Sequence, residues 1–196
     1  MITLKSKVLA AVARWAYPEF DRMHLHMVLF ADGEYVACDG HRLVRVPYEY
    51  DGEPFGVDRS HLLAAIAAQE ASHVDAYDDE DGPRVPRLND KLSIECKDGR
   101  VHLTIANGVT MIVPRRDPAM YPPYDKVTPR SPGHVPPDGY HFNPRYLADM
   151  DVVNSAITGG RNSYVKVAAW SDRHSAVLFE GAEGTRFVIM PARQER

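Results

Sequence analysis

The chain has 196 residues, of which 44% are hydrophobic and 26% charged, which is typical of a globular protein with one large or two small domains. Its formal net charge of -4 disfavours a protein that coats nucleic acid through bulk positive charge, so any such contact must be local. No apolar run approaches the roughly 18 residues of a membrane span, and two cysteines without a secretory segment favour reduced thiols in the cytoplasm.

Three segments of the chain share one pattern, in which an apolar strand end leads through a polar residue into an amphipathic helix. Asp58 and Asn143 are good N-cap residues for the second and third helices. Pro144 suits a first helical position, where its missing N–H costs nothing. The pattern predicts short helices within residues 4–12, 57–65 and 142–150.

Strand-forming sequence follows each of these segments, so the repeated unit is βαβββ. Three copies predict an α+β fold with short helices packed on antiparallel sheets. Pairs of an acidic residue and a glycine predict the turns, because glycine accepts the positive φ of a tight hairpin; they are Asp32-Gly33, Asp98-Gly99 and Glu183-Gly184. The strand regions are 24–30 and 34–47 in the first unit, 91–96 and 100–114 in the second, and 164–170 and 175–191 in the third.

Two weakly structured connectors interrupt the repetition. One is acidic and runs from residue 75 to 86, and the other is proline-rich and runs from residue 118 to 137. We expect residues 1–129 to form one domain of two units, and residues 138–196 to form a half-domain of one unit.

The segment from residue 35 to 47 has two interpretations. Cys38, Asp39 and His41 carry the groups of a nucleophilic site, whereas Asp39-Gly40 between two β-rich runs predicts a hairpin turn. Residues of one tight hairpin cannot easily adopt the geometry of nucleophile, base and orienting group, and no oxyanion-hole motif accompanies them. We therefore predict that the chain is not an enzyme and uses no cofactor.

Metal binding has little support in the sequence. His24 and His26 would share one face of a strand, but two ligands without a third nearby are weak evidence for a metal. The acidic residues 78–81 do not follow the order of a calcium-binding loop. We predict no metal site.

Three motifs resemble the bacterial sliding clamp family, the β subunit of DNA polymerase III. Val36-Ala37-Cys38-Asp39-Gly40-His41-Arg42-Leu43 is similar to the Ala-Thr-Asp-Gly-His-Arg-Leu segment of the family's middle domain, with cysteine in place of threonine. Residues 121–129 are similar to the Phe-Pro-Asp-Tyr run that closes that domain. Residues 187–193 resemble the terminal Val-Met-Pro-Met-Arg-Leu strand. The resemblance implies a shortened DNA-clamp fold, with three units where the family's subunit has six.

In this family a hydrophobic pocket between the middle and last domains accepts short peptides of polymerases and other partners. The resemblance implies that apolar walls receive a Leu or Phe anchor while His41 and Arg42 supply polar contacts at the rim. The alternative is that Leu43, Val127 and Met190 are ordinary core residues. The implied pocket residues are Cys38, Gly40, His41, Arg42, Leu43, Pro122, Lys126, Val127, Val188, Met190, Pro191 and Ala192.

The inner face of a clamp ring would be lined by the helices. Lys7, Ala11 and Arg14 fall on one side of the first helix and could meet phosphate, in contacts that are salt-sensitive and blind to base sequence. The alternative is a solvated charged face, because the second helix is alanine-rich and Asp149 and Asp151 lie on the third. The candidate DNA-facing residues are Lys5, Lys7, Arg14, Arg59, Arg145 and Arg161.

The resemblance implies a processivity factor that forms a ring around duplex DNA and tethers DNA polymerase or repair proteins to it, in the cytoplasm of a bacterial or phage-infected cell, at the nucleoid. A ring of about twelve units by family analogy predicts four chains with three units each. No membrane contact is expected. The alternative function is a peptide-binding module that sequesters clamp-binding partners without encircling DNA.

Overall fold

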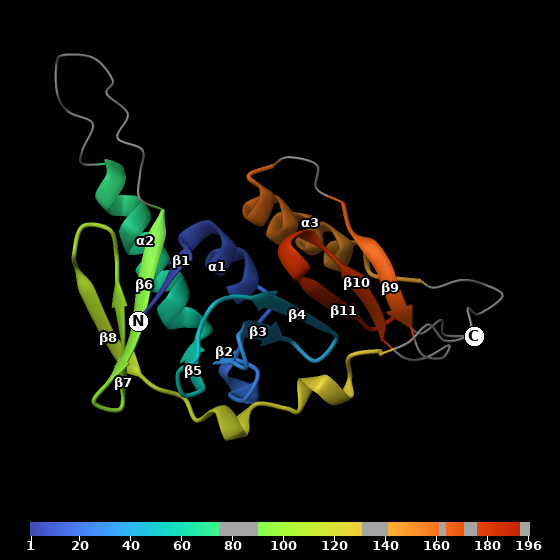
Figure 1. Cartoon of the computed structure of the whole chain (residues 1–196), viewed down its shortest axis with the longest axis horizontal. Coiled ribbons are helices and arrows are strands. Elements are labelled where there is room, and N and C mark those ends of the chain that lie inside the picture. The colour runs from blue at the N-terminus through green and yellow to red at the C-terminus, as the bar shows by residue number, and fades with distance from the viewer. Residues whose placement is uncertain (75–89, 131–140, 161–163, 171–175, 193–196) are drawn as a thin grey trace, which may run out of the picture.

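The structure is a computed structural model that describes residues 1–74, 90–130, 141–160, 164–170 and 176–192. Within these ranges it has three α-helices and two antiparallel sheets (Figure 1). The helices are α1 (Ser6–Ala13), α2 (Arg59–Val74) and α3 (Pro144–Thr158).

The smaller sheet has four strands in the order β1-β6-β7-β8, and its neighbouring strands are antiparallel. Ile2 of the first strand lies opposite Ile94, and Val101 lies opposite Val113. The strands are β1 (Ile2–Lys5), β6 (Lys91–Lys97), β7 (Arg100–Thr104) and β8 (Thr110–Pro114).

The larger sheet has seven strands in the order β5-β2-β3-β4-β11-β10-β9, again antiparallel. The pairing of β4 with β11 joins the first and third units in one sheet, with Val44 opposite Phe187. The strands are β2 (Met27–Ala31), β3 (Glu34–Cys38), β4 (Arg42–Pro47), β5 (Phe55–Asp58), β9 (Lys166–Trp170), β10 (Val177–Glu180) and β11 (Arg186–Ile189).

The first two units exchange their leading strands. β1 precedes α1 but pairs with β6 of the second unit, whereas β5 precedes α2 but pairs with β2 of the first. Residues 141–143, just before α3, form no strand, so the leading strand expected for the third unit is not seen in the described residues. The division into two domains stays a prediction.

The larger sheet buries apolar side chains on both faces. On the face that carries the helices, Leu9, Trp15 and Phe187 belong to one large cluster, and the rings of Trp15 and Phe187 lie 5.5 Å apart. On the opposite face, which we call the outer face, Leu43 and Val188 belong to a second cluster. Strand alternation places neighbouring side chains in different clusters.

Helix α1 contacts both α2 and α3, and in Figure 1 the three helices follow one another across the molecule. This arrangement corrects the expected basic face of the first helix. Ala11, predicted to be on that face, is buried, and Arg14 lies just beyond the helix. Only a narrow strip at Lys7 is exposed within α1, because helices cover it on two sides.

Most local predictions are confirmed. Both residues of the three predicted turns have positive φ, from 51° to 74°, and Asn143 caps α3 by accepting a hydrogen bond from the Arg145 N–H. Pro144 is the first residue of that helix. Asp58 directly precedes α2, as expected, but its carboxylate accepts two hydrogen bonds of 2.8 Å from Arg116, and its role as a helix cap stays a prediction.

The proline-rich connector is better ordered than expected. Its described part contains two 3-10 turns, Pro118–Met120 and Tyr124–Lys126, and buries Tyr121 and Tyr124. The acidic connector lies outside the described residues. None of the described helices is long and apolar enough to cross a membrane.

Candidate functional site

A cavity of about 390 Å³ opens on the outer face of the larger sheet. Its walls are the β3–β4 hairpin, the C-terminal end of β11 and the proline-rich segment from residue 121 to 127. Elements that are distant in sequence therefore form one site. The cavity is lined by Leu25, Cys38, Gly40, His41, Arg42, Leu43, Tyr121, Pro122, Pro123, Tyr124, Lys126, Val127, Val188 and Met190.

The hairpin wall is shaped by Asp39 and Gly40. One carboxylate oxygen of Asp39 accepts hydrogen bonds from the backbone N–H groups of His41, at 2.9 Å, and Arg42, at 3.0 Å. Gly40 has φ of 95°, which side chains rarely tolerate. These residues therefore build the turn, as the sequence predicts, and hold His41 exposed at the mouth of the cavity.

The floor is formed by paired strands. Leu43 of β4 lies opposite Val188 of β11, and both are at most 3% exposed. Because side chains alternate along a strand, Leu43 and Arg45 face the proline-rich segment while Val44 faces the helices. Leu43 is thus both a core residue and part of the wall.

The proline-rich segment is anchored by aromatic rings. Tyr121 and Tyr124 are buried, with their ring centroids 6.2 Å apart, and the Thr128 hydroxyl donates a 3.0 Å hydrogen bond to the Tyr124 carbonyl. Such rings bury much apolar area in a short segment. This burial explains why the segment is ordered despite its four prolines between residues 118 and 129.

An ionic network centred on the buried Arg45 and Glu34 ties this segment to the sheet. Arg45 donates 2.7 Å hydrogen bonds to Glu34 and to Asp125, and its guanidinium lies 4.8 Å from the centre of the Tyr124 ring. Arg186 also pairs with Glu34. Burial lowers the pKa of Arg45, but the hydrogen bonds and charges of Glu34 and Asp125 outweigh it and raise the pKa overall. The guanidinium therefore stays charged and bonded.

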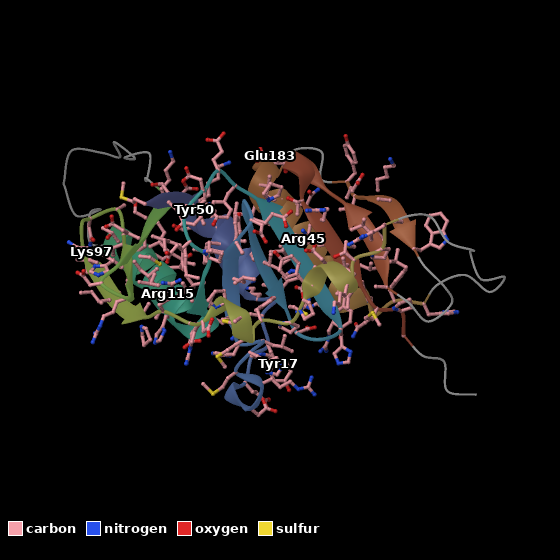
Figure 2. The ribbon with its side chains drawn as sticks, turned by 60° about the horizontal axis from the view of Figure 1, so that its bottom comes forward. Tyr17, Arg45, Tyr50, Lys97, Arg115 and Glu183 are labelled. Carbon is pink, nitrogen blue, oxygen red and sulfur yellow. The ribbon has the colours of Figure 1, made fainter. Side chains whose placement is uncertain are left out.

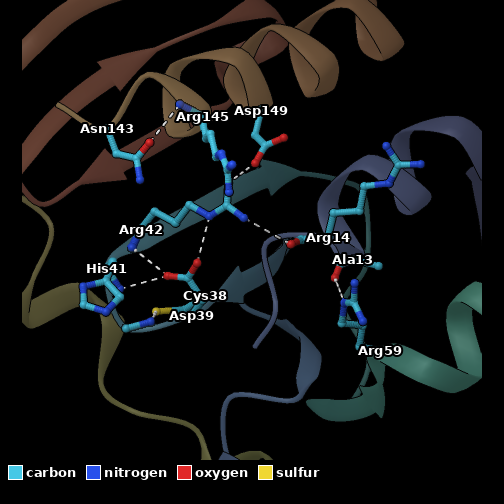
Figure 3. Close-up of polar contacts among 11 residues, drawn as sticks. Ala13, Arg14, Cys38, Asp39, His41, Arg42, Arg59, Asn143, Arg145 and Asp149 are labelled. Carbon is cyan, nitrogen blue, oxygen red and sulfur yellow. Dashed lines mark hydrogen bonds and ion pairs between the residues drawn. The ribbon is translucent and has the colours of Figure 1, made fainter. Parts of the chain in front are cut away.

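Arg42 has a different role from the one expected at the rim. Its guanidinium points to the helix side, where it pairs with Asp39 at 2.9 Å and with Asp149 of α3 (Figure 3). It also lies 4.8 Å and 5.0 Å from the rings of Trp15 and Tyr146. Part of Arg42 lines the cavity, but its charge connects the hairpin to α3 and is not free for a ligand.

Cys38 lacks the properties of a nucleophile. Burial raises the pKa of its thiol, and the negative charge of Asp39 raises it further. A hydrogen bond from the Gly40 N–H to Sγ, at 3.3 Å, lowers the pKa by a smaller amount than burial raises it, so that the resulting pKa is about 11. The thiol is therefore protonated at neutral pH. The geometry favours the turn interpretation of this hairpin, and the absence of enzymatic activity stays a prediction.

Ten of the twelve pocket residues expected from the resemblance line the cavity. The other two, Pro191 and Ala192, follow Met190, and the Ala192 N–H donates a 2.7 Å hydrogen bond to the His141 carbonyl. Val127 is 52% exposed and Met190 40% exposed, so these two are not ordinary core residues. Peptide binding by this set stays a prediction.

Four lining residues were not expected: Leu25, Tyr121, Pro123 and Tyr124. Three of them lie within the motif from residue 121 to 129, and their aromatic and proline types could have indicated a wall. Leu25 lies between a 3-10 turn and β2, and its sequence surroundings carry no signal for the site.

The candidate DNA-facing residues do not form one free basic surface. Lys5, Lys7, Arg14 and Arg145 are exposed. The Lys5 ammonium lies 3.5 Å from the Ile157 carbonyl. Arg59 donates a 3.1 Å hydrogen bond to the Ala13 carbonyl, and its pKa is lowered by burial and by the charge of Arg14. Arg161 lies outside the described residues.

The described residues hold no cluster of three or more potential metal ligands. His24 and His26 precede β2 and are not on a strand, which corrects the shared face expected from the sequence. His24 is exposed, whereas His26 is buried with its Nδ1 2.8 Å from the Tyr17 carbonyl.

No protein-family model and no curated protein matches the chain. Solved structures do match it. The DNA polymerase III β subunit of Pseudomonas aeruginosa superposes with a TM-score of 0.59 at 17% identity, over 98% of this chain and 66% of that one. The β subunit of Borrelia burgdorferi superposes with a TM-score of 0.64 at 14% identity, over 99% of this chain and 63% of that one. The sliding clamp of Bacillus subtilis superposes with a TM-score of 0.61 at 13% identity, over 99% of this chain and 64% of that one.

The chain thus spans just under two thirds of the length of these clamps while almost all of it superposes on them. At these identities the likeness concerns the fold. The repeated helix–sheet units, the antiparallel sheets and the superpositions together show that this α+β chain has the fold of the bacterial sliding clamps, the β subunits of DNA polymerase III, which confirms the resemblance of its three motifs.

Proposed function

We propose that the chain is a clamp-type protein that binds short peptides with an apolar anchor in the outer-face cavity. The observation that carries this proposal is the cavity itself, whose floor is apolar and whose mouth exposes Val127 and Met190. A hollow lined by apolar side chains with a few polar groups at its edge is the usual form of a ligand site.

The anchor, a leucine or phenylalanine side chain, enters between Leu43, Val188 and the proline-rich segment. His41 and Lys126 are exposed at the mouth and supply polar contacts that orient the peptide. The ionic network at Arg45 holds the proline-rich wall in place before the ligand arrives, which reduces the ordering cost of binding.

We further propose that chains assemble into a ring around duplex DNA at the nucleoid of a bacterial or phage-infected cell, and that the bound peptides belong to DNA polymerase or repair proteins. The fold, the three helices in a row and the exposed Lys7, Arg14 and Arg145 support this assembly. Enclosure gives processivity without tight binding, because a tethered partner gains a high effective concentration.

Three units per chain support a ring of four chains. β9 is an edge strand of the larger sheet, and it receives no leading strand from another unit in the described residues, whereas β2 and β6 each receive one. The third unit of a second chain would pair with this third unit around a two-fold axis and complete the half-domain.

The second candidate is a peptide-binding module that never encircles DNA. The specific observation in its favour is the weak basic surface: Arg59 bonds to the Ala13 carbonyl, and Arg42 is neutralised by Asp39 and Asp149. Such a module would sequester clamp-binding partners through the same cavity.

Two measurements test these proposals separately. Titration of a fluorescent peptide with a Gln-x-x-Leu-Phe anchor tests the cavity, and a wild-type chain that ignores the peptide overturns peptide binding. Retention on closed circular DNA, with release after linearisation, tests encirclement. Peptide binding without retention on circles supports the module instead of the ring.

A further inference from the structure

The smaller sheet ends in a strand that is unusually open to pairing. β8 is an edge strand, and in the part of the chain that the structure describes no other strand lies along its outer side. It has no charged side chain and no bulge, and its proline is at the very end. Ile112 is 52% exposed, and Val109 just before the strand is 59% exposed. An exposed, apolar edge without a bulge pairs readily with another strand.

The internal repeat shows which strand of the first unit corresponds to β8 of the second unit. Asp98-Gly99 precedes β7 as Asp32-Gly33 precedes β3, and both turns have the same φ values within a degree. β8 then pairs with β7 as β4 pairs with β3: Pro114 lies opposite Arg100, and Pro47 lies opposite Glu34. β8 is therefore the counterpart of β4 in the second unit, and Met111 is the counterpart of Val44.

The outer edge of β4 is occupied by β11, the last strand of another unit, in an antiparallel pair centred near Val44 and Phe187. Two last strands thus pair with each other in this fold. Antiparallel pairing is also compatible with a two-fold axis between identical strands. We propose that β8 pairs with β8 of a second copy of this chain.

We place the two-fold axis at Met111, because its counterpart Val44 lies near the centre of the β4–β11 pair. Met111, as the counterpart of Val44, lies on the axis opposite its own copy, and Ile112 lies opposite Thr110 of the other copy. The exposed Ile112 side chain is then covered on the side of the smaller sheet away from the helices, while the half-buried Met111 closes the helix side. An even register such as this keeps corresponding side chains on the same face of the joined sheet.

A second, independent observation concerns the helices. α1 contacts a helix on each side, and its Ala11 is buried. Ala64, the counterpart of Ala11 on α2, is exposed. The β4–β11 junction carries α1 beside α3, so a β8–β8 junction would bring the two copies of α2 together and cover that alanine. Small side chains allow such close approach.

This inference rests on the proposed assembly and names one of its contacts. Each chain then makes one two-fold contact through β8 and a different one through its third unit. Four chains that alternate these two contacts form a closed ring. Each contact alone gives only a dimer. The contact at β8 lies on a different sheet from the peptide cavity, so the two sites can be disrupted separately.

The test measures the mass of the full chain by light scattering after gel filtration. Ile112→Lys places a charge on the proposed contact and is expected to halve the mass, from four chains to two. Thr3→Lys adds the same charge to β1, at the other edge of the same sheet, and is expected to leave the mass unchanged. An Ile112→Lys protein with the wild-type mass overturns the β8 contact while leaving the ring proposal standing.

Crosslinking gives a second readout. In a Cys38→Ser, Cys96→Ser background, Met111→Cys is expected to form a disulfide-linked dimer, because opposite residues of antiparallel strands lie about 4.5–5.5 Å apart at Cα, within the range of a disulfide. Thr104→Cys on the neighbouring strand β7 is not expected to crosslink.

Two further outcomes of the mass measurement are decisive. If the wild-type chain is a dimer that Ile112→Lys converts to a monomer, β8 pairing is supported and the four-chain ring is overturned. If the wild-type chain is a monomer, both proposals are overturned. Peptide titration of each variant reports on the cavity independently.

Discussion

Arg45 on β4 and Asp125 in the proline-rich segment are joined by a 2.7 Å hydrogen bond between residues 80 positions apart. Arg45, labelled in Figure 2, is buried, and a hydrogen bond from its Nε holds it against Glu34. The pair attaches one wall of the cavity to its floor. We therefore expect the loss of this pair to affect the ligand site more than the stability of the chain.

We expect Asp125→Asn to weaken peptide binding several-fold while changing the free energy of unfolding by less than about 1 kcal/mol. The Asp125 side chain is 61% exposed, and ion pairs of that kind contribute little to stability. The amide keeps the shape but loses the charge that draws Arg45. Peptide titration and urea denaturation measure the two quantities. A large loss of stability with unchanged peptide affinity would contradict this view of the pair.

Met190→Ala is expected to reduce peptide affinity by roughly tenfold, because the truncation removes apolar contact area at the mouth, worth about 1–2 kcal/mol. Met190 is 40% exposed, so its loss leaves the core intact. Val167→Ala on β9 is the matched control, since Val167 is 48% exposed and does not line the cavity. Equal affinities of the two variants would remove Met190 from the site. Leu43→Ala is a poorer probe, because emptying a buried leucine site costs about 2–5 kcal/mol of stability by itself.

Arg42→Lys is expected to destabilise the chain by about 1–3 kcal/mol although the charge is kept. A lysine ammonium cannot bond Asp39 and Asp149 in the same planar arrangement, nor can it stack between Trp15 and Tyr146 in the same way. Thermal or urea unfolding measures the loss. Arg115→Lys is the control, because Arg115 pairs with Glu53, which is 86% exposed; its expected effect is below about 0.5 kcal/mol.

Cys38 is expected to react slowly with iodoacetamide at pH 8, with a rate that rises as the pH approaches 11. Its pKa of about 11 lies above the model-peptide range, so burial favours the protonated thiol and the thiolate fraction is roughly 100-fold lower than for an unshifted cysteine. Measured in a Cys96→Ser background, the rate should fall further when peptide fills the cavity that Cys38 lines. Rapid alkylation at pH 8 would show that the thiol is not buried as described.

The raised pKa of Cys38 also determines how the free energy of unfolding changes with pH. Because the folded pKa of Cys38 exceeds its unfolded value, the contribution of the protonated thiol is fully present below pH 9 and is lost as the pH rises toward 11. Cys38→Ser, which does not titrate there, should flatten that part of the stability profile.

Local structure was predictable because it depends on neighbouring residues. Asn143 and Pro144 determine the start of α3, and Asp32-Gly33 forms its turn through backbone angles that few other residue pairs accept. Contacts between distant segments were not. The partner of Arg42 on α3 is 107 residues away, and the burial of Ala11 depends on helices packed on two sides, which no helical pattern in α1 reveals.

In the cavity, too, some features could be predicted from the sequence and others could not. Most of its lining was expected only because three motifs resemble a family, since periodicity alone would place Leu43 and Val188 in an ordinary core. Tyr121 and Tyr124 were missed as wall residues because a segment with many prolines was expected to be weakly structured. Their rings, packed on the outer face of the sheet, supply the order that the backbone sequence did not indicate.

The pairing of β4 with β11 has a thermodynamic consequence. Leu43 and Val188 form the cavity floor only when the third unit is docked on the first. A peptide that requires this floor binds the docked form alone, so by mass action it adds RT ln(1 + [L]/Kd) to the docking free energy. In a chain cleaved between the two units, the peptide would hold the fragments together, and its concentration would set how many stay joined.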